Sequence, residues 1–496
     1  MTITAQQILD LKTSSTRNKR VLLVAPEEND GKPYEHFPSG ALILLGSLLH
    51  ARGHSVRLVH MTADHVNVDG LQAVVERFVP DLVGLTMNTY QTRSVREVSA
   101  ALKRRNAALP IIVGGPHVSA LREHIFKFFP HVDYAVCGEG EQALLELLAG
   151  VPPDQIPGLC RPGQSQVVRS TLPDLDFIPL PRLDLIKLAR FPGADPHRAY
   201  PQMFIMASRG CPFQCTFCNK SVFGHGVRFR RPELIVREVE WLYSEYGIRE
   251  IFFQDDTFNL KRDWAEHVMQ LLIDRKLSRK LAFATSFRAN RNLVDADLLR
   301  MAKAAGFWLI FYGVENGNQA MLNAMGKGLT LEEIRRAFRL THAAGLETKA
   351  SFMIGMPGET ENTVEESIRL WRELDPLAAG VGPAIPFPDT EFDHTVTASG
   401  HKLSEDFDLF SSEAVLIRTA QMDADCIRLA LVRFRKVVLK KAMRDLFHWP
   451  RGVILLRSLL NPRYLFHVVR RMVRYLVVER IGQNQVARTA SAKHQP

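Results

Sequence analysis

Residues 209–219 read RGCPFQCTFCN and place Cys211, Cys215 and Cys218 within eight positions of one another. An apolar run precedes them and predicts a strand, so we expect the cysteines on the loop at its carboxyl end. Three soft thiolates this close together favour an iron–sulfur cluster or zinc. The alternative is three cysteines buried as small apolar side chains. The Gly-Cys-Pro turn and the polar neighbours disfavour it.

A structural zinc site needs a fourth ligand, usually from a second close pair. The other cysteines are scattered along the chain and offer no such pair: Cys137, Cys160 and Cys426. Three ligands for a four-iron cluster leave one iron free to bind a substrate or cofactor. A cluster with an open iron of this kind indicates a catalytic site, not a structural one.

In the sequence around and after the cysteines, predicted strands alternate with predicted helices from about residue 204 to 390. Six strands are predicted: Phe204–Ser208, Glu250–Gln254, Leu281–Thr285, Trp308–Val314, Thr348–Ile354 and Gly380–Ile385. Six parallel strands with helices between them predict a partial α/β barrel, with its active site at the carboxyl ends of the strands.

A separate βα series precedes the barrel. Its strands are predicted at Val21–Ala25, Val56–Val59, Leu82–Thr86, Ile111–Val113 and Tyr134–Val136, with helices over Ser39–Arg52 and Leu71–Phe78. The alternation predicts a doubly wound parallel sheet, which binds ligands at the carboxyl ends of its strands. Glycine-rich turns stand there, Gly114-Gly115-Pro116-His117 and Gly138-Glu139-Gly140-Glu141, and let the backbone approach a large flat ligand.

The pattern divides the chain into a polar leader (1–20), a first module (21–150), a linker (151–200), the barrel (201–400) and a helical, basic C-terminal region (401–496). The composition, 46% hydrophobic and 23% charged, excludes a disordered or fibrous protein. No apolar run is long enough to span a membrane, and the leader has no apolar core of a secretory signal. Six scattered cysteines make no disulfide framework. We therefore expect a cytoplasmic protein.

The formal net charge is +10, but it is unevenly distributed. Residues 427–496 hold 16 Lys and Arg against two acids, so the body of the protein is slightly acidic. Within this tail, Arg463–Val478 predicts an amphipathic helix with arginines beside an apolar stripe. Such a helix can lie on an anionic membrane surface or dock on the barrel with its arginines in solvent.

With its CxxxCxxC pattern after the first barrel strand, the sequence resembles the radical S-adenosylmethionine (SAM) superfamily. The preceding module resembles the cobalamin (B12)-binding domain of the class B radical SAM methylase-like branch. Motifs that agree in order include Gln254-Asp255-Asp256-Thr257-Phe258, Tyr312-Gly313-Val314-Glu315-Asn316 and Ile354-Gly355-Met356-Pro357-Gly358-Glu359. The resemblance covers roughly residues 20–400. It implies a flavodoxin-like cobalamin domain followed by a partial (β/α)6 radical SAM barrel.

By this resemblance, Cys211, Cys215 and Cys218 ligate a [4Fe–4S] cluster whose open iron binds SAM. Residues implied in SAM binding are Phe217, Arg288, Glu315, Ile354 and Gly355. One departure is the turn Pro386-Phe387-Pro388-Asp389-Thr390, where the family often has glycine before the threonine. Because Asp tolerates unusual backbone angles, we expect the turn to form. The wall of the active site beside this turn is expected to differ from that of the family.

Residues expected to border cobalamin are Thr86, Asn88, Gly114, Gly115, Gly138 and Glu139. An ordinary turn or helix-cap role is the alternative for the polar ones. Many B12 proteins carry a cobalt-ligating histidine in an Asp-x-His-x-x-Gly loop after the first strand. Here that strand leads into Pro26–Gly31, and His36 lies nearby outside the frame. We therefore predict cobalamin without a lower histidine ligand.

The resemblance implies a methyltransferase acting on an unactivated carbon of a small-molecule or lipophilic substrate. The alternative is an oxidative cyclase or rearrangement enzyme with the same cofactors, acting on a tetrapyrrole or secondary metabolite. RNA modification is disfavoured because no cysteines remain for the second cluster of methylthiolating relatives, and we expect no nucleic-acid partner. The cysteine triad argues against a non-catalytic cobalamin sensor. A flavodoxin or ferredoxin is the expected electron donor, and no residue stands out as a proton donor.

Overall fold

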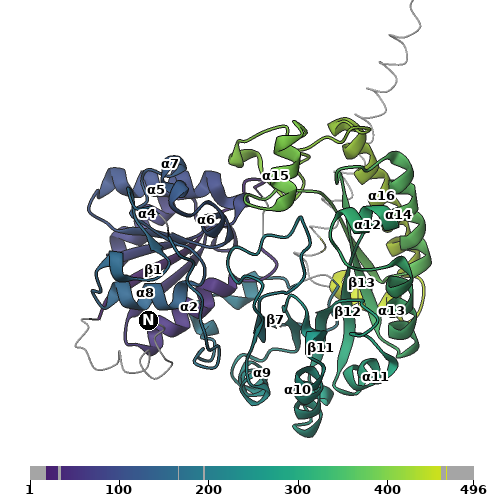
Figure 1. The fold of residues 1–496 in the computed structure, drawn as a ribbon. Helices are drawn as coiled ribbons and strands as arrows, with labels where there is room; N and C mark the ends of the chain where they lie inside the picture. The colour runs from purple at the N-terminus through teal and green to yellow at the C-terminus, as the bar shows by residue number, and fades with distance from the viewer. Residues whose placement is uncertain (1–17, 32–34, 166, 194–195, 460–464, 466–496) are drawn as a thin grey trace, which may run out of the picture.

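The structure is a computed structural model that describes residues 18–31, 35–165, 167–193, 196–459 and 465 (Figure 1). Two large sheets, each with its own helices, lie side by side, and the first precedes the second along the chain. Within the described ranges, no helix is both long and apolar enough to cross a bilayer. The predicted helix Arg463–Val478 lies outside these residues.

The first sheet has the strand order β2-β1-β3-β4-β5-β6. Its parallel strands are β1 (Arg20–Ala25), β2 (Ser55–His60), β3 (Leu82–Thr86), β4 (Ile111–Gly114) and β5 (Tyr134–Val136), which confirms the doubly wound prediction. A sixth strand, β6 (Leu159–Cys160), pairs antiparallel with β5 and comes from the stretch predicted as a linker. It brings the Sγ atom of Cys160 within 3.3 Å of Cys137 Sγ, so two cysteines that are scattered in sequence are neighbours in space.

Side-chain alternation along β1 explains why helices cover both faces of this sheet. Val21 and Leu23 point to one face and pack with α2 (Gly40–Ala51) and α8 (Gly140–Leu148). Leu22 and Val24 point to the other and pack with α4 (Val68–Phe78) and α5 (Thr92–Arg105). With both faces buried, the strands are continuous apolar runs, as parallel sheets require.

The second sheet is the predicted partial barrel, all parallel, with the order β14-β13-β12-β11-β10-β7. Its strands are β7 (Gln202–Ile205), β10 (Glu250–Phe253), β11 (Ala282–Phe287), β12 (Phe307–Glu315), β13 (Glu347–Ile354) and β14 (Ala378–Pro383). Helices line its outer side (Figure 1): α9 (Pro232–Tyr246), α10 (Arg262–Asp274), α11 (Ala296–Ala304), α13 (Leu331–Ala343) and α14 (Glu361–Leu374). The largest apolar core lies between these helices and the sheet.

After the barrel, the chain returns to the first module before it ends in two helices. Past α15 (Glu391–Ala398), the short helix η8 (Phe407–Leu409) lies against α5. Thr92 Oγ1 donates to Phe407 O at 3.0 Å, and Asn29 Nδ2 donates to Phe410 O at the same distance. The ring of His117 meets Phe407 edge-on, with 4.7 Å between centroids.

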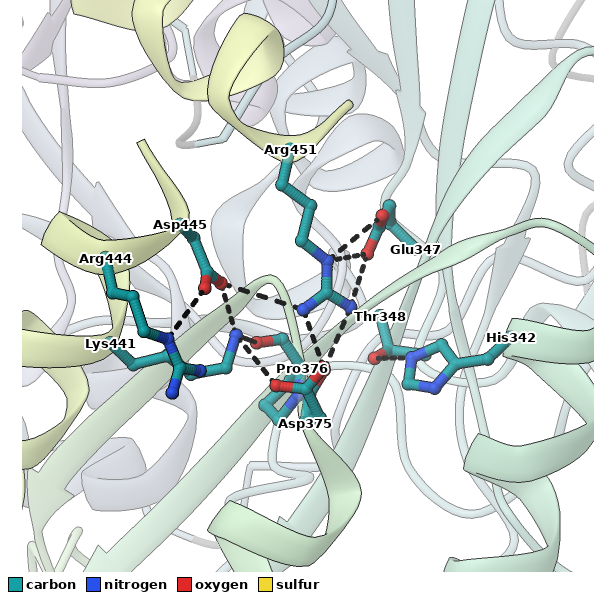
Figure 2. Close-up of polar contacts among 9 residues, drawn as sticks. All are labelled: His342, Glu347, Thr348, Asp375, Pro376, Lys441, Arg444, Asp445 and Arg451. Carbon is teal, nitrogen blue, oxygen red and sulfur yellow. Dashed lines mark hydrogen bonds and ion pairs between the residues drawn. The ribbon is translucent and has the colours of Figure 1, made fainter. Parts of the chain in front are cut away.

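The helix α16 (Ala424–Asp445) packs on the edge strand β14, and α17 (Arg451–Leu459) follows a short turn. Figure 2 shows the ion-pair network that fixes the junction. Lys441 Nζ lies 3.0 Å from Pro376 O and 3.0 Å from an Asp375 oxygen, and Arg451 contacts Asp375 at 2.8 Å and Glu347 at 3.0 Å. Because Glu347 begins β13, this network lies at the amino ends of the strands.

Candidate functional site

The three cysteines lie on a loop that a small β-ladder closes at its base. The strands β8 (Ser208–Arg209) and β9 (Arg228–Phe229) pair antiparallel across the excursion between them. At its start Gly210 has φ +94°, and a Cβ there would lie 2.2 Å from Gly226 O, so only glycine fits. The loop is anchored to the barrel because Thr216 N donates to Met325 O at 3.0 Å.

The donor set fits an iron–sulfur cluster. All three thiols are free, and burial raises the pKa of the Cys218 thiol to about 11 against the pull of Lys220, with Cys215 and Cys211 adding to the rise. Three thiolates that share one loop therefore need a positive centre to stabilise them. In the described part of the chain, no three His, Cys, Asp or Glu side chains group as ligands of one metal ion. In a [4Fe–4S] cluster each cysteine binds its own iron, so the loop can supply three corners.

Arg288, a predicted SAM residue, lies against this loop. Its guanidinium stacks on the Phe213 ring, 3.5 Å from the centroid, and Nη1 lies 3.9 Å from Cys215 Sγ. It also donates to Asn290 Oδ1 at 2.7 Å and to Lys327 O. A buried cation is thereby fixed beside the cysteine loop.

Glu315 and Phe217, two further predicted SAM residues, are joined by a residue that the sequence analysis missed. Lys327 Nζ lies 2.9 Å from Glu315 Oε1 and 5.9 Å from the centroid of the Phe217 ring. Ser351 Oγ donates to the other Glu315 oxygen at 3.1 Å. The two charged side chains are only 9% and 12% exposed, so the pair stands at the strand ends in a largely desolvated place.

Of the last two predicted SAM residues, Ile354 ends β13 and Gly355 directly follows it. Gly355 has φ +110°, and its N–H donates to Glu359, which also accepts from Asn316 Nδ2 at 2.8 Å. Burial raises the pKa of Glu359 to about 7, although these two donors favour its charged form. Ile354 is fully buried and faces the helices, because strand alternation places it opposite Ser351. Its side chain is therefore part of the core.

A cavity of about 730 Å³ lies between the first sheet and the barrel. All six predicted cobalamin residues line it: Thr86, Asn88, Gly114, Gly115, Gly138 and Glu139. A Cβ added at Gly114 or Gly140 would meet nothing closer than 3.8 Å or 4.0 Å, so any larger residue there would extend into this space. The glycines thus leave room along the strand ends for a flat group such as the corrin ring.

Glu139 lines this cavity, and its carboxylate is held there by ion pairs and a backbone N–H. Its carboxylate pairs with Arg209 and, at 2.6 Å, with Arg228, and it accepts from Leu172 N at 2.6 Å. Glu141 contacts the same Arg209 at 2.7 Å. Burial lowers the pKa of Arg209, but the two carboxylates outweigh it and hold the pKa above its usual value. The glycine-rich turn of the first module therefore holds the residue that precedes the cysteine loop.

Family models match both modules: residues 205–370 match the radical SAM superfamily, and residues 32–148 match the B12 binding domain. The chain is 30% identical over 362 residues to an uncharacterized methyltransferase of Pyrococcus horikoshii, covering 71% of this chain and 77% of that protein. It is 25% identical over 442 residues to the anaerobic magnesium-protoporphyrin IX monomethyl ester cyclase of Rubrivivax gelatinosus, covering 85% and 78%.

Among solved structures, the cobalamin-dependent SAM radical enzyme OxsB, with aqua-cobalamin and SAM bound, matches with a TM-score of 0.69. The match covers 97% of this chain and 76% of that one at 17% identity, and it shows a common fold.

Proposed function

The chain belongs to the cobalamin-binding branch of the radical SAM superfamily, and we propose that it is a methyltransferase acting on an unactivated carbon. Its two domains imply a [4Fe–4S] cluster, SAM and cobalamin as cofactors. When bound, these supply a 5′-deoxyadenosyl radical that removes a hydrogen atom and a methyl group that replaces it. The observation that carries the proposal is the shared cavity, since Phe204, Met206 and Gln254 of the barrel line it together with the cobalamin-module strand ends.

The chain's own residues hold and orient these groups. Cys211, Cys215 and Cys218 would bind the cluster, and Arg288 would place a positive charge beside it. Glu315 and Lys327 offer one carboxylate and one ammonium side by side. That pair complements the ammonium and carboxylate of an amino acid, which is the part of SAM that has to be held at the cluster.

The cavity favours a small lipophilic natural-product or cofactor substrate. Much of its lining is apolar, with Phe37, Phe204, Met206 and Phe223 among the residues that face it. Such walls exclude water, which protects a carbon radical from side reactions. They also favour an apolar substrate through the hydrophobic effect.

Oxidative cyclisation or rearrangement with the same cofactors is the second candidate. The similarity to the cyclase of Rubrivivax gelatinosus favours it, because that similarity extends over most of both chains. The two reactions differ in product mass, since methylation adds CH₂ and cyclisation removes hydrogen.

Anaerobically reconstituted enzyme, given the small-molecule extract of a strain that lacks it, tests the proposal. With SAM carrying a deuterated methyl group, a product should appear that has gained a labelled methyl, together with S-adenosylhomocysteine and 5′-deoxyadenosine. Cys215→Ala should abolish the labelled product and 5′-deoxyadenosine. Cys426→Ala, which lies outside the loop, should still give them. SAM cleavage that never yields S-adenosylhomocysteine, with a product that has lost hydrogen, establishes the cyclase instead.

A flavodoxin or ferredoxin type protein is the proposed electron donor, because SAM cleavage consumes one electron at the cluster. No nucleic-acid partner is proposed. We place the protein in the cytoplasm with peripheral contact at the inner membrane surface through its basic C-terminal region. The excess of cations over acids in that region supports the contact.

A further inference from the structure

The turn between α16 and α17 exposes two aromatic side chains almost completely. Phe447 is 89% exposed and Trp449 is 83% exposed, more than any other large apolar side chain in the described ranges. Met443, one helical turn earlier, is 47% exposed. Single exposed apolar residues are ordinary on protein surfaces, but three at one corner are a patch that water solvates poorly.

Cations surround this patch. Lys436, Lys440 and Arg444 follow the exposed face of α16 at helical spacing up to Met443 and Phe447. Between residues 436 and 459 the chain has one acid, Asp445, which is 4% exposed and paired with Lys441. The outer surface of this segment therefore carries positive charge without exposed carboxylates. We call these six residues the basic–aromatic corner: Lys436, Lys440, Met443, Arg444, Phe447 and Trp449.

The inner side of the same turn explains why the aromatics cannot fold inward. Lys441 and Arg451 are 9% and 18% exposed and point to the barrel, where Asp375 and Glu347 hold them (Figure 2). Ile454 and Leu455 of α17 pack against a small apolar cluster with Trp308. Because ion pairs and this cluster fill the inner side, Phe447 and Trp449 are held outward on a fixed base.

We propose that the basic–aromatic corner docks on an anionic phospholipid bilayer. Trp and Phe insert readily at the interface between headgroups and acyl chains, and neighbouring Lys and Arg are attracted to anionic headgroups. Charge complementarity continues beyond the corner, since residues 460–496 add seven Lys and Arg and one acid, Glu479. The corner would thus make the peripheral membrane contact proposed above, whichever reaction the enzyme catalyses.

Docking at this corner orients the enzyme. Glu347 and Pro376, which contact Arg451 and Lys441, stand at the amino ends of β13 and β14. The cysteine loop, Glu315 and Gly355 stand at the carboxyl ends of the barrel strands. The bound bilayer therefore lies at the end of the barrel opposite the cofactors.

Trp449 provides a built-in probe in the full-length protein. Of the five tryptophans, Trp264, Trp308 and Trp371 are at most 6% exposed, and Trp241 is only partly exposed. Vesicles of phosphatidylcholine with phosphatidylglycerol should shift the Trp449 emission to the blue and protect it from iodide, and vesicles of phosphatidylcholine alone should not. The shift should vanish in Trp449→Phe.

Co-sedimentation with the same vesicles measures affinity. Phe447→Ser with Trp449→Ser should weaken binding about tenfold or more, whereas Phe128→Ser, at another exposed aromatic, should leave it unchanged. Lys436→Gln, Lys440→Gln and Arg444→Gln together should also weaken it, and high salt should release the wild type. Without lipid, the variant with Phe447→Ser and Trp449→Ser should cleave SAM at the same rate as the wild type.

Equal binding by wild type and the double Ser variant overturns the proposal, as does equal binding to both kinds of vesicle. So does an unshifted Trp449 emission in bound protein. A single-stranded RNA that binds more tightly than the vesicles and displaces them would assign the corner to nucleic acid instead. Loss of SAM cleavage in the wild type would count against the proposed reaction and leave the vesicle result standing.

Discussion

Arg209 and Glu139 form a buried ion pair that joins the two modules, with side chains 5% and 0% exposed. Arg209 stands two residues before Cys211, and Glu139 directly precedes α8 at the strand ends of the cobalamin module. Together with the Arg209–Glu141 and Arg228–Glu139 pairs, this contact fixes where the cluster loop begins relative to the cavity.

Glu139→Gln should destabilise the docking of the two modules. The change leaves Arg228 without its carboxylate partner, and breaking a buried pair costs about 3 kcal/mol. We expect a lower midpoint of thermal unfolding and faster loss of bound cobalamin on gel filtration. Asp176→Asn removes an exposed pair with Arg231 and should cost less than about 1 kcal/mol. Equal effects of the two variants would contradict the role of Glu139.

Lys327→Gln should weaken SAM binding about tenfold or more, because it removes the ammonium paired with Glu315. The iron content of the reconstituted protein should stay the same, since Lys327 is no ligand. Equilibrium binding of SAM and iron analysis measure the two effects. Lys303→Gln is the control, because Lys303 Nζ contacts Gly345 O before β13, at the far end of the barrel. Unchanged SAM affinity in Lys327→Gln would refute the assignment.

Glu359 should make stability fall as the pH rises. Burial raises its pKa to about 7 from an ordinary 4.5, so the folded state holds a proton that the unfolded state releases. Its contribution is complete below the ordinary value and is lost as the pH passes about 7. Glu359→Gln should give a shallower decline of the unfolding midpoint between about pH 5 and pH 8.

Glu250 and Asp255 also have pKa values raised to about 7 by burial, so part of the decline should remain in that variant. Glu361→Gln, at the exposed start of α14, should decline as the wild type does. A Glu359→Gln profile as steep as the wild type would show that the carboxyl is charged throughout this range.

Cobalamin bound to the protein should lack a histidine ligand below cobalt. His36 is the histidine that faces the cavity, and its Nδ1 lies 3.0 Å from Gly193 O. The electron paramagnetic resonance spectrum of the cob(II) form should show no nitrogen splitting from the protein, and His36→Ala should leave it unchanged. Nitrogen splitting that disappears in His36→Ala would make this residue the ligand.

Regular patterns in the sequence predicted most of the fold. Apolar runs separated by helical periods predicted both parallel sheets, and the spacing of three cysteines identified the loop that defines the site. The six glycine-turn and strand-end residues line the cavity because the carboxyl ends of parallel strands meet at one edge. That rule needs only strands that run parallel, which the alternation of strands and helices predicts.

Contacts between distant segments could not be predicted in this way. Lys327 reaches Glu315 because the chain folds back after α12 (Gln319–Ala324), and Glu139 meets Arg209 across 70 positions. Sequence periodicity contains no information on such pairings. Ile354 shows the same limit within one strand. The sequence motif that contains it was recognised, but the motif does not tell which face of β13 Ile354 occupies. That face is the one opposite Ser351.

Cys160 shows how short strands escape detection. Two residues, Leu159 and Cys160, are too few for any periodicity, yet they pair with β5 and bring two thiols together. Pairing at the edge of an existing sheet needs little intrinsic propensity, because the sheet already offers its free hydrogen-bonding groups.

The return of η8 to α5 gives the two modules a second tie, far along the chain from the Arg209–Glu139 pair. With both walls of the cavity secured, separating them means breaking the buried ion pair, the backbone contacts of Phe407 and its ring contact with His117. We therefore expect a cofactor held between the two walls to be released faster when either tie is removed.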